Sequence, residues 1–176
     1  MIKKILYKGI VFIILVMIAG CAGKESKKEV VEIFGEMGDI VSIQYSARNQ
    51  EGTLIKENGK WQWEHNPELT LNQEEVLEEE RTIQEAKMTM EAEGMENPSA
   101  YGLRESKYKL TVKDVNGQER TLHLGTKAGE DTYYATVDDK KDLYIVSEDI
   151  LDVWEELAEQ KQISEVLDAM SKPTSY

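Results

Sequence analysis

Apolar and polar side chains alternate along much of the chain. From residue 40 to residue 47 every second position lies on the same face, which is the period of a half-buried strand. Segments of similar character follow at 53–56, 60–64, 108–112, 121–124, 132–137 and 143–146. Asn58-Gly59 and Asn116-Gly117 separate two pairs of them, and Asn-Gly favours a two-residue hairpin turn because both central residues need positive φ. The pattern therefore predicts a series of antiparallel hairpins.

The period lengthens to that of an amphipathic helix in two places. The first predicted helix begins at the N-cap residue Asn72, has Glu75 three residues later, and ends at Gly94. Its expected apolar stripe contains Val76, Leu77, Ile83, Ala86 and Met90. The run of acids at residues 78–80 points in diverging directions, so we expect a solvated face there and not a shared metal ion.

The second predicted helix follows Ser147, whose hydroxyl is expected to cap it. Its expected buried side contains Ile150, Leu151, Trp154, Leu157 and Ala158. A further apolar series either continues this helix or forms a short final one, and it contains Ile163, Val166, Leu167 and Met170. Strands followed by a helix, twice over, predict an α+β fold: antiparallel β-hairpins in a sheet, helices packed on one face, and two β-then-α halves.

The start of the chain has the features of a bacterial lipoprotein signal peptide. Three lysines give a basic beginning, an apolar stretch follows, and Ile18, Ala19 and Gly20 lead directly to Cys21. Small residues before the cysteine allow cleavage, and the thiol then carries a diacylglyceryl group whose two acyl chains anchor the protein durably. An uncleaved transmembrane helix is the competing interpretation, but the apolar run of about 11 residues is short of the roughly 20 that a span needs.

The predicted organisation is a signal peptide at residues 1–20, a flexible tether at 21–36 and a single α+β domain at 37–172. The tether begins with small and charged residues, and its later apolar positions leave open whether a short strand or helix packs on the domain there. We expect the mature protein at the cell membrane, lipid-anchored on the extracytoplasmic face, with the lipid bilayer as a partner through Cys21.

Charge narrows the classes of partner. The chain of 176 residues has a formal net charge of −13, and without the three lysines of the signal peptide 18 basic residues oppose 34 acidic ones, a net charge of −16. Such a surface repels phosphate backbones and anionic headgroups, so no nucleic-acid partner is expected. Once Cys21 is lipidated no cysteine is left, which excludes disulfides and thiol catalysis in the mature protein.

No residue pattern predicts a catalytic, metal or cofactor site. The two histidines, His65 and His123, lie on separate predicted hairpins and are too few for a zinc site, and no Gly-x-Ser-x-Gly motif accompanies them. Residues 138–142 lack the spacing of a calcium loop and are expected to form a charged hairpin tip. We therefore expect no enzyme activity, no cofactor and no metal.

Trp61 and Trp63 lie on one face of a predicted strand, and two interpretations are open. Tryptophans at this spacing can stack a sugar or a base, or they can form a core ridge covered by a helix, which we favour. Together with Tyr101 they are the candidate contact residues for a ligand or partner. Gly102 is expected to supply a backbone conformation closed to other residues, and Gly125 a strand end.

Several short motifs together resemble one bacterial family. They are Lys60-Trp61-Gln62-Trp63, Tyr101-Gly102-Leu103, Leu122-His123-Leu124-Gly125, Tyr133-Tyr134-Ala135 and Leu143-Tyr144-Ile145-Val146. From about residue 39 to residue 157 the chain is similar to the domain-of-unknown-function family 4340. The resemblance implies an exported or membrane-attached accessory protein, in some members beside export-type ABC transporter components, and it carries over no catalytic residues. Asn72 departs from the family's pattern, in which Asp is usual at the helix start, but either residue can cap a helix.

Two functional classes remain. The first is a non-catalytic accessory lipoprotein with a membrane or envelope protein partner, and its observable is an exposed apolar or aromatic patch large enough for a protein contact. The alternative is a cell-envelope carbohydrate-binding module or hydrolase, whose observable is Trp61 and Trp63 exposed beside a cleft with converging carboxylates. We favour the first, because both tryptophans lie on a strand face that a helix should cover.

Overall fold

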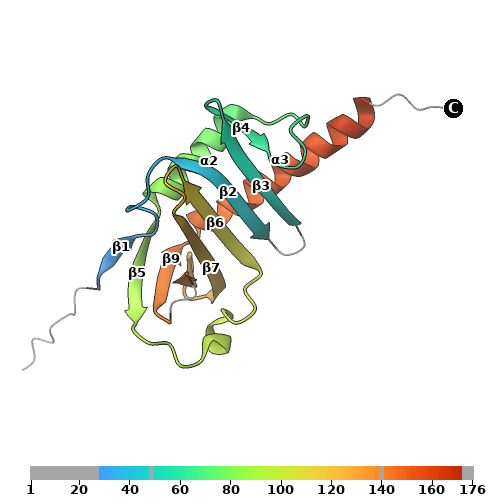
Figure 1. The fold of residues 1–176 in the computed structure, drawn as a ribbon. Coiled ribbons are helices and arrows are strands. Elements are labelled where there is room, and N and C mark those ends of the chain that lie inside the picture. The colour runs from blue at the N-terminus through green and yellow to red at the C-terminus, as the bar shows by residue number, and fades with distance from the viewer. Residues whose placement is uncertain (1–27, 48–49, 139–140, 172–176) are drawn as a thin grey trace, which may run out of the picture.

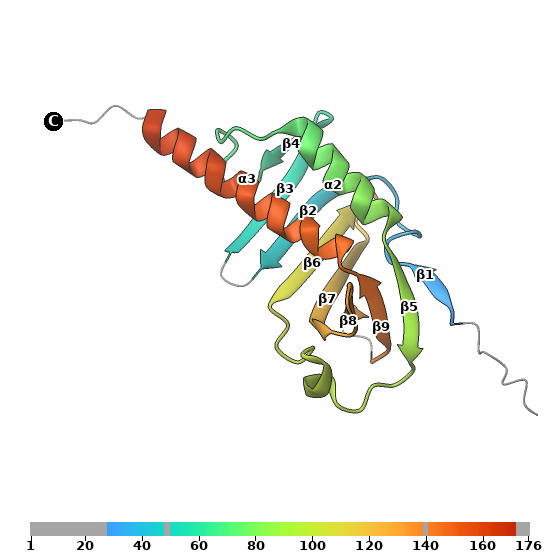
Figure 2. The same ribbon diagram turned by 180° about the vertical axis from the view of Figure 1, so that it is seen from behind.

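One antiparallel sheet and two helices make up the fold (Figure 1). The computed structural model describes residues 28–47, 50–138 and 141–171. The nine strands of this part are β1 (Val30–Glu32), β2 (Ile40–Ala47), β3 (Gln50–Glu57), β4 (Lys60–Trp63), β5 (Lys87–Ala92), β6 (Tyr108–Asp114), β7 (Glu119–Lys127), β8 (Thr132–Val137) and β9 (Leu143–Ser147). The helices are α2 (Gln73–Glu85) and α3 (Asp149–Ser171), and a 3₁₀ turn, η1 (Pro98–Tyr101), lies between β5 and β6. Both helices lie on the same face of the sheet (Figure 2), so the predicted α+β class is confirmed.

The strands follow the order β1-β5-β9-β8-β7-β6-β2-β3-β4 across the sheet. Each half of the chain has its strands first and its helix last, as predicted. The pairing of β2 with β6 joins the two halves into a single sheet. β5 follows α2 to the far side of this sheet, where it lies between β1 and β9. One edge strand therefore comes from the start of the described chain, and the other edge strand, β4, directly precedes the first helix.

The predicted Asn-Gly turns are confirmed. Asn58 and Gly59 join β3 to β4 with φ values of 53° and 77°, the positive values that a type I′ turn requires. Gly117, with φ of 80°, lies in the turn between β6 and β7. Glycine and asparagine reach this left-handed region at the lowest cost, so the Asn-Gly pair determines the first connection. In the second connection only the glycine has a positive φ, and Asn116 does not.

Asp114 closes the β6–β7 turn from inside. Its carboxylate accepts hydrogen bonds from the N–H groups of Gly38, at 2.8 Å, Gln118, at 2.8 Å, and Asn116, at 2.9 Å. The bond from Gly38 and those from the turn stabilise the ionised form and hold the pKa of Asp114 below its usual range. The same side chain thus fixes the turn and the approach of the chain to β2.

The first helix is shorter than predicted. Asn72 caps it as expected, with its side-chain oxygen accepting from the N–H of Glu74 at 3.2 Å, but the helix ends at Glu85 and not at Gly94. The next residues form β5, paired on both sides by β1 and β9. The segment from Lys87 to Ala92 fits a period of two as well as a helical stripe, and hydrogen bonding to two neighbouring strands decides between the periods.

The end of β7 differs from the prediction, and the length of α3 answers a question that the sequence left open. Gly125 lies inside β7, at a shift in register between Leu124 and Lys127, and does not end the strand. The apolar series that begins at Ile163 continues the second helix, so α3 is one helix of 23 residues. Ser147 lies at its start, with its hydroxyl oxygen accepting from the N–H of Asp149 at 3.4 Å.

The later residues of the predicted tether pack on the domain. Val30–Glu32 form β1, and the following Ile33 and Phe34 are 0% and 3% exposed. Arg120 of β7 fixes this segment, because its Nη1 donates to the carbonyl oxygen of Ile33 at 2.7 Å. The folded domain therefore extends back to about residue 30, and the open question about this stretch is answered by a strand.

One apolar core holds the helices on the sheet. Val76 and Ile83 of α2, and Val153, Trp154 and Leu157 of α3, are all completely buried. Burial of each such side chain is worth about 1.5–3 kcal/mol relative to exposure, so these five positions hold both helices on the sheet. Neither of the two described helices combines the length and the apolar character that a membrane span requires.

Candidate functional site

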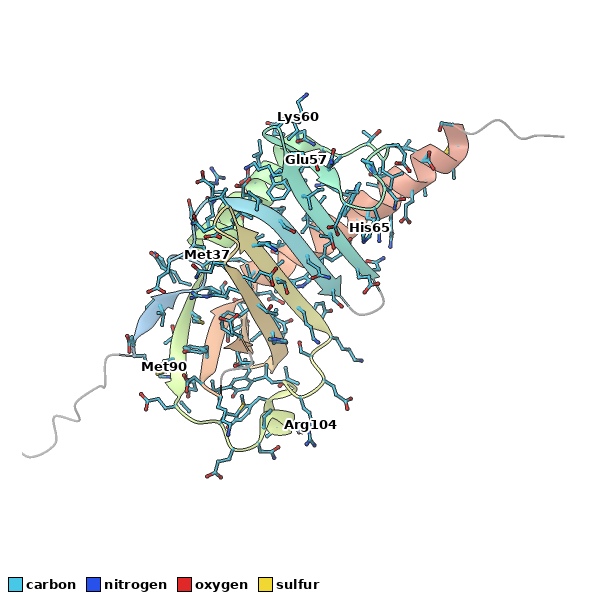
Figure 3. The ribbon with its side chains drawn as sticks, viewed as in Figure 1. Met37, Glu57, Lys60, His65, Met90 and Arg104 are labelled. Atoms are coloured by element: carbon cyan, nitrogen blue, oxygen red, sulfur yellow. The ribbon has the colours of Figure 1, made fainter. Side chains whose placement is uncertain are left out.

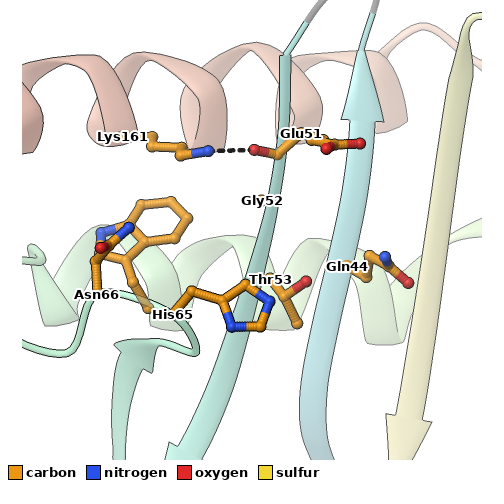
Figure 4. A pocket seen from close by; sticks show the side chains of 8 residues that line it. Gln44, Glu51, Gly52, Thr53, His65, Asn66 and Lys161 are labelled. Atoms are coloured by element: carbon orange, nitrogen blue, oxygen red, sulfur yellow. Dashed lines mark hydrogen bonds between the residues drawn. The ribbon is translucent and has the colours of Figure 1, made fainter.

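A polar cleft lies beside the outer side of β3. Because β4 pairs with β3 only from Leu54 to Glu57, the earlier residues of β3 have no strand on that side. The cleft has a volume of about 210 Å³. Figure 4 shows the residues that line it: Gln44, Glu51, Gly52, Thr53, Trp63, His65, Asn66 and Lys161. We call it the β3-edge cleft.

The β3-edge cleft offers hydrogen-bonding groups but little converging charge. Lys161 of α3 reaches across it and donates to the carbonyl oxygen of Glu51 (Figure 4). The His65 side chain is 84% exposed and lies 3.6 Å from the carboxylate of Glu64. Among the residues that line the cleft only Glu51 carries a carboxylate, whereas glycoside cleavage uses two. The volume is also below the roughly 300 Å³ at which small-molecule sites usually begin.

Both candidate tryptophans belong to the core. Trp61 is 2% exposed and Trp63 is 3% exposed, so neither can stack a ligand. Trp63 packs edge-on against Tyr45, with 6.5 Å between the ring centroids. The favoured interpretation, a core ridge, is confirmed, and the assignment of these two residues as contact residues is corrected. The cause is the contact between β4 and α2, which covers the inward face of the strand.

A buried ion pair holds Trp61 in place. The carboxylate of Glu80 accepts from Lys56 Nζ at 2.8 and 2.9 Å and from Trp61 Nε1 at 3.0 Å. The side chains of Lys56 and Glu80 are 23% and 9% exposed, and the ammonium also lies 5.2 Å from the centroid of the Trp61 ring. Glu80 is therefore not on the solvated face predicted for residues 78–80. Its spacing from Val76 and Ile83, four and three residues away, is the signal that places it on the buried stripe.

The outward backbone groups of Trp61 in β4 are also occupied. The side chain of Gln73, in the first turn of α2, accepts from the N–H of Trp61 at 2.9 Å and donates to its carbonyl oxygen at 2.8 Å. An amide side chain that bonds both the N–H and the carbonyl group of one residue takes the place of a neighbouring strand. The first turn of α2 therefore covers the edge of the sheet at Trp61.

Glu79 lies where the two helices meet. Partial burial raises the pKa of Glu79 to about 7, and the charges of Glu156, Glu78, Asp152 and Glu75 add to the effect. A group whose pKa is raised in the folded state contributes stability below its unfolded pKa, near 4.5, and loses it as the pH rises through 7. The contact between α2 and α3 should therefore be tighter in mildly acidic solution.

We expect Glu79→Gln to raise the free energy of unfolding at pH 8 by about 1 kcal/mol, after allowance for solvent screening of a partly exposed group, and to have little effect at pH 5. Urea unfolding at the two pH values measures the difference. Glu159→Gln, an exposed acid on α3, is the matched control for the loss of one negative charge. An equal gain at both pH values, or the same gain from the control, would contradict the role of Glu79.

Tyr101 lies far from the tryptophans. Arg104, close to Tyr101 in sequence, and Lys60, next to Trp61, are at opposite ends of the molecule (Figure 3). Tyr101 is half-buried and packs edge-on against Tyr134, with 4.9 Å between ring centroids. The structure therefore does not bring the three candidate contact residues into one site.

Two of the motifs noted in the sequence meet in space. Gly102 has φ of 71°, as its predicted role requires, and its N–H donates to the carbonyl oxygen of Ser99 at 3.2 Å. The turn then lies directly on Gly125 of β7: a Cβ at Gly125 would be 2.0 Å from the carbonyl oxygen of Tyr101. The Tyr-Gly-Leu turn and the Leu-Gly step are thus the two sides of one backbone contact.

Asp138 and Asp142, the two described acids of the β8–β9 connection, have separate structural partners. Asp138 accepts from the N–H of Thr121 at 2.7 Å, and Asp142 accepts from the N–H of Gly94 at 3.2 Å. Within the part of the chain that the structure describes, no group of three or more His, Cys, Asp or Glu residues could hold a metal ion.

The end of α3 carries a row of exposed apolar side chains, which we call the α3 stripe: Ile163, Val166, Leu167 and Met170. They are 52%, 56%, 53% and 79% exposed. The spacing of three, four and seven residues from the first of them places all four on one face of the helix. Figures 1 and 2 show that this end of α3 extends beyond the strands. The sequence identified these positions as a stripe but did not show that the domain leaves them uncovered.

Cys21 and the residues before it, Ile18, Ala19 and Gly20, lie outside the described residues. Lipidation at Cys21 therefore stays a prediction.

Comparison with known proteins gives one family. The chain matches no curated protein and no solved structure. The model of a domain of unknown function, DUF4340, matches residues 61–160, from Trp61 of β4 to Gln160 of α3. The matched region contains the two glycine motifs, α2 and the first half of α3, whereas β1, β2 and β3 complete the same sheet from outside it. More than half of the chain is covered, and the protein belongs to the DUF4340 family.

Proposed function

We propose that this protein is a membrane-anchored lipoprotein of the cell envelope, held on the extracytoplasmic face, that acts as a non-catalytic binding or accessory protein. The α3 stripe is the observation that carries the proposal. Exposed apolar residues scattered singly over a surface are ordinary, but four on one helix face beyond the body of the domain favour a protein contact. An envelope transporter is the class of partner that the family resemblance favours.

The signal sequence supports the location in this proposal. Lipidation at Cys21 would place the folded domain a few residues from the bilayer, because β1 begins at Val30. At roughly 3.3–3.6 Å per extended residue, this link keeps the domain within about 30 Å of its anchor. The acidic surface would repel anionic headgroups and keep the domain free to meet a neighbouring protein.

We expect the full-length protein to sediment with membranes and to incorporate an alkyne-labelled fatty acid when it is produced in a bacterial host that processes lipoproteins. Cys21→Ala should abolish the label and release most of the protein from the membrane fraction when the signal peptide is removed, because the thiol that carries the lipid is lost. Ser26→Ala, in the same segment, is the control and should behave as the wild type. Labelling that persists in the Cys21→Ala variant would refute lipidation at this position.

Crosslinking in intact cells of the native host tests the accessory role. Recovery of the same membrane protein with the wild type but not with Cys21→Ala would support a tethered accessory protein. Retention on cell-wall glycan without a protein partner would instead favour the carbohydrate-binding class.

A further inference from the structure

Three of the four residues of the α3 stripe lie beyond the last buried residue of the helix. Ser164 is the last buried residue of α3, and its hydroxyl contacts the carbonyl oxygens of Gln160, at 2.7 Å, and Thr70. The residues after it have no buried member, although the helix continues to Ser171. Short helices without tertiary contacts are marginal in water, so a further surface is needed to explain an apolar face here.

The acids around the stripe indicate the charge of that surface. Glu155, Glu156 and Glu159 are exposed on the same helix face in the two turns before the stripe, and residues 162–171 contain no lysine or arginine. Lys161 is already bonded to the carbonyl oxygen of Glu51. The last turn of the helix has no basic residue to offset the partial negative charge of the helix C-terminus. The stripe is thus an apolar row in a negative field.

The negative charge near the stripe distinguishes among three candidate partners: a second copy of the chain, a lipid surface and a helix of another protein. A second copy of the chain packed alongside in the same direction would bring its own Glu155, Glu156 and Glu159 against the same residues, which like charges disfavour. An anionic lipid surface is repelled for the same reason. An amphipathic helix with lysine or arginine beside its apolar face satisfies both the row and the charge, because helix-on-helix recognition uses anchors at the spacing that the stripe presents.

We infer that the α3 stripe docks an amphipathic helix of a partner protein whose apolar face is flanked by basic residues. The inference rests on the proposed accessory function and specifies the chemistry of the partner. The interface is small, since four side chains carry it, so association should be weak, reversible and sensitive to salt.

The test measures binding of two synthetic helical peptides to the full-length protein in nanodiscs of zwitterionic lipid, with empty nanodiscs as background. The peptides share one leucine face and differ only in their flanks, lysine in one and glutamate in the other. We expect the lysine peptide to bind at least tenfold more tightly than the glutamate peptide and to lose most of its affinity as salt rises from 50 to about 500 mM. Equal affinity for the two peptides would overturn the inference.

The variant Ile163→Ser, Leu167→Ser, Met170→Ser should weaken binding of the lysine peptide at least tenfold. All three side chains are more than half exposed, so the fold should persist, which circular dichroism and the unfolding midpoint check. The matched control is Leu77→Ser with Val115→Ser, which removes apolar residues 50% and 59% exposed elsewhere on the surface. Equal loss in stripe and control variants overturns the inference, and so does a dimer or vesicle binding that disappears with the stripe.

The experiments distinguish failure of the docking surface from failure of the proposed accessory function. Capture of an envelope protein in cells that is unaffected by the stripe variant would leave the accessory function standing and refute the docking surface. Stripe-dependent binding of the lysine peptide together with fatty-acid labelling that persists in the Cys21→Ala variant would support the docking surface and refute lipidation at Cys21.

Discussion

Lys56→Met is expected to lower the free energy of unfolding by about 3–4 kcal/mol. The substitution removes the ammonium that Glu80 binds through both oxygens and leaves a buried carboxylate with only the Trp61 indole as donor. Breaking such a pair from one side is costly because the remaining carboxylate is shielded from most of the water and has lost its counter-ion. Urea unfolding followed by tryptophan fluorescence measures the loss, and one of the reporting side chains is in the network itself.

The double variant Lys56→Met, Glu80→Met separates charge from packing. Replacement of a buried pair by apolar residues of similar volume is often neutral, so the double variant should be within about 1 kcal/mol of the wild type. Arg81→Met is the control on the same helix: it breaks the pair with Glu78, whose partners are both more than 60% exposed, and should cost no more than about 0.5 kcal/mol. Additive losses in the double variant would show that the two side chains act independently.

The second large effect is expected at Gly125, where alanine should destabilise the fold by about 3 kcal/mol. The new Cβ would lie 2.0 Å from the carbonyl oxygen of Tyr101, and an obstacle of backbone atoms cannot rotate away as a side chain can. The η1 turn must therefore move off β7, which separates Tyr101 from Tyr134. Hydrogen exchange of residues 98–103 should accelerate along with the fall in stability.

Gly94→Ala gives the matched comparison. Gly94 has φ of 68° and open space where a Cβ would be, so alanine there should cost only the left-handed conformation, about 1–2 kcal/mol. If Gly125→Ala and Gly94→Ala lower the free energy of unfolding equally, the close approach of the two backbones is not the reason for glycine at position 125.

The sequence predicts the turns, the helix cap and most strands, because these depend on single residues or on short patterns. The Asn58-Gly59 turn and the Asn72 cap follow from what single residues can do with φ or with a side-chain oxygen, and both are found as expected. The alternating segments became strands, and the strands and helices formed the expected class. The buried Trp61 and Trp63 also follow from the face they share on one strand.

Features that depend on contacts between residues far apart in the chain could not be predicted. Residues 87–92 fit a helical stripe, and they form a strand because β1 and β9 bond them from both sides. Glu80 lies among acids that looked solvated, and its burial depends on Lys56, which is 24 residues earlier. The contact of Tyr101 with Gly125 is also 24 residues apart and has no periodic signature. The exposure of the α3 stripe could not be predicted, since an amphipathic pattern does not reveal whether the domain is long enough to cover it.

The edges of the sheet affect whether the protein aggregates when many copies are close together. β1 has three residues and β4 has four, the outward groups of Trp61 are bonded by Gln73, and Lys161 occupies the carbonyl oxygen of Glu51 on the open side of β3. Short or capped edges and a lysine at the open position are features that prevent strands of different molecules from adding to each other. Proteins confined to a two-dimensional surface collide far more often than proteins in dilution, and edge-to-edge aggregation is the hazard of such collisions for a nine-stranded sheet. This fold can therefore be present at high density as separate molecules, as the proposed membrane anchor would require.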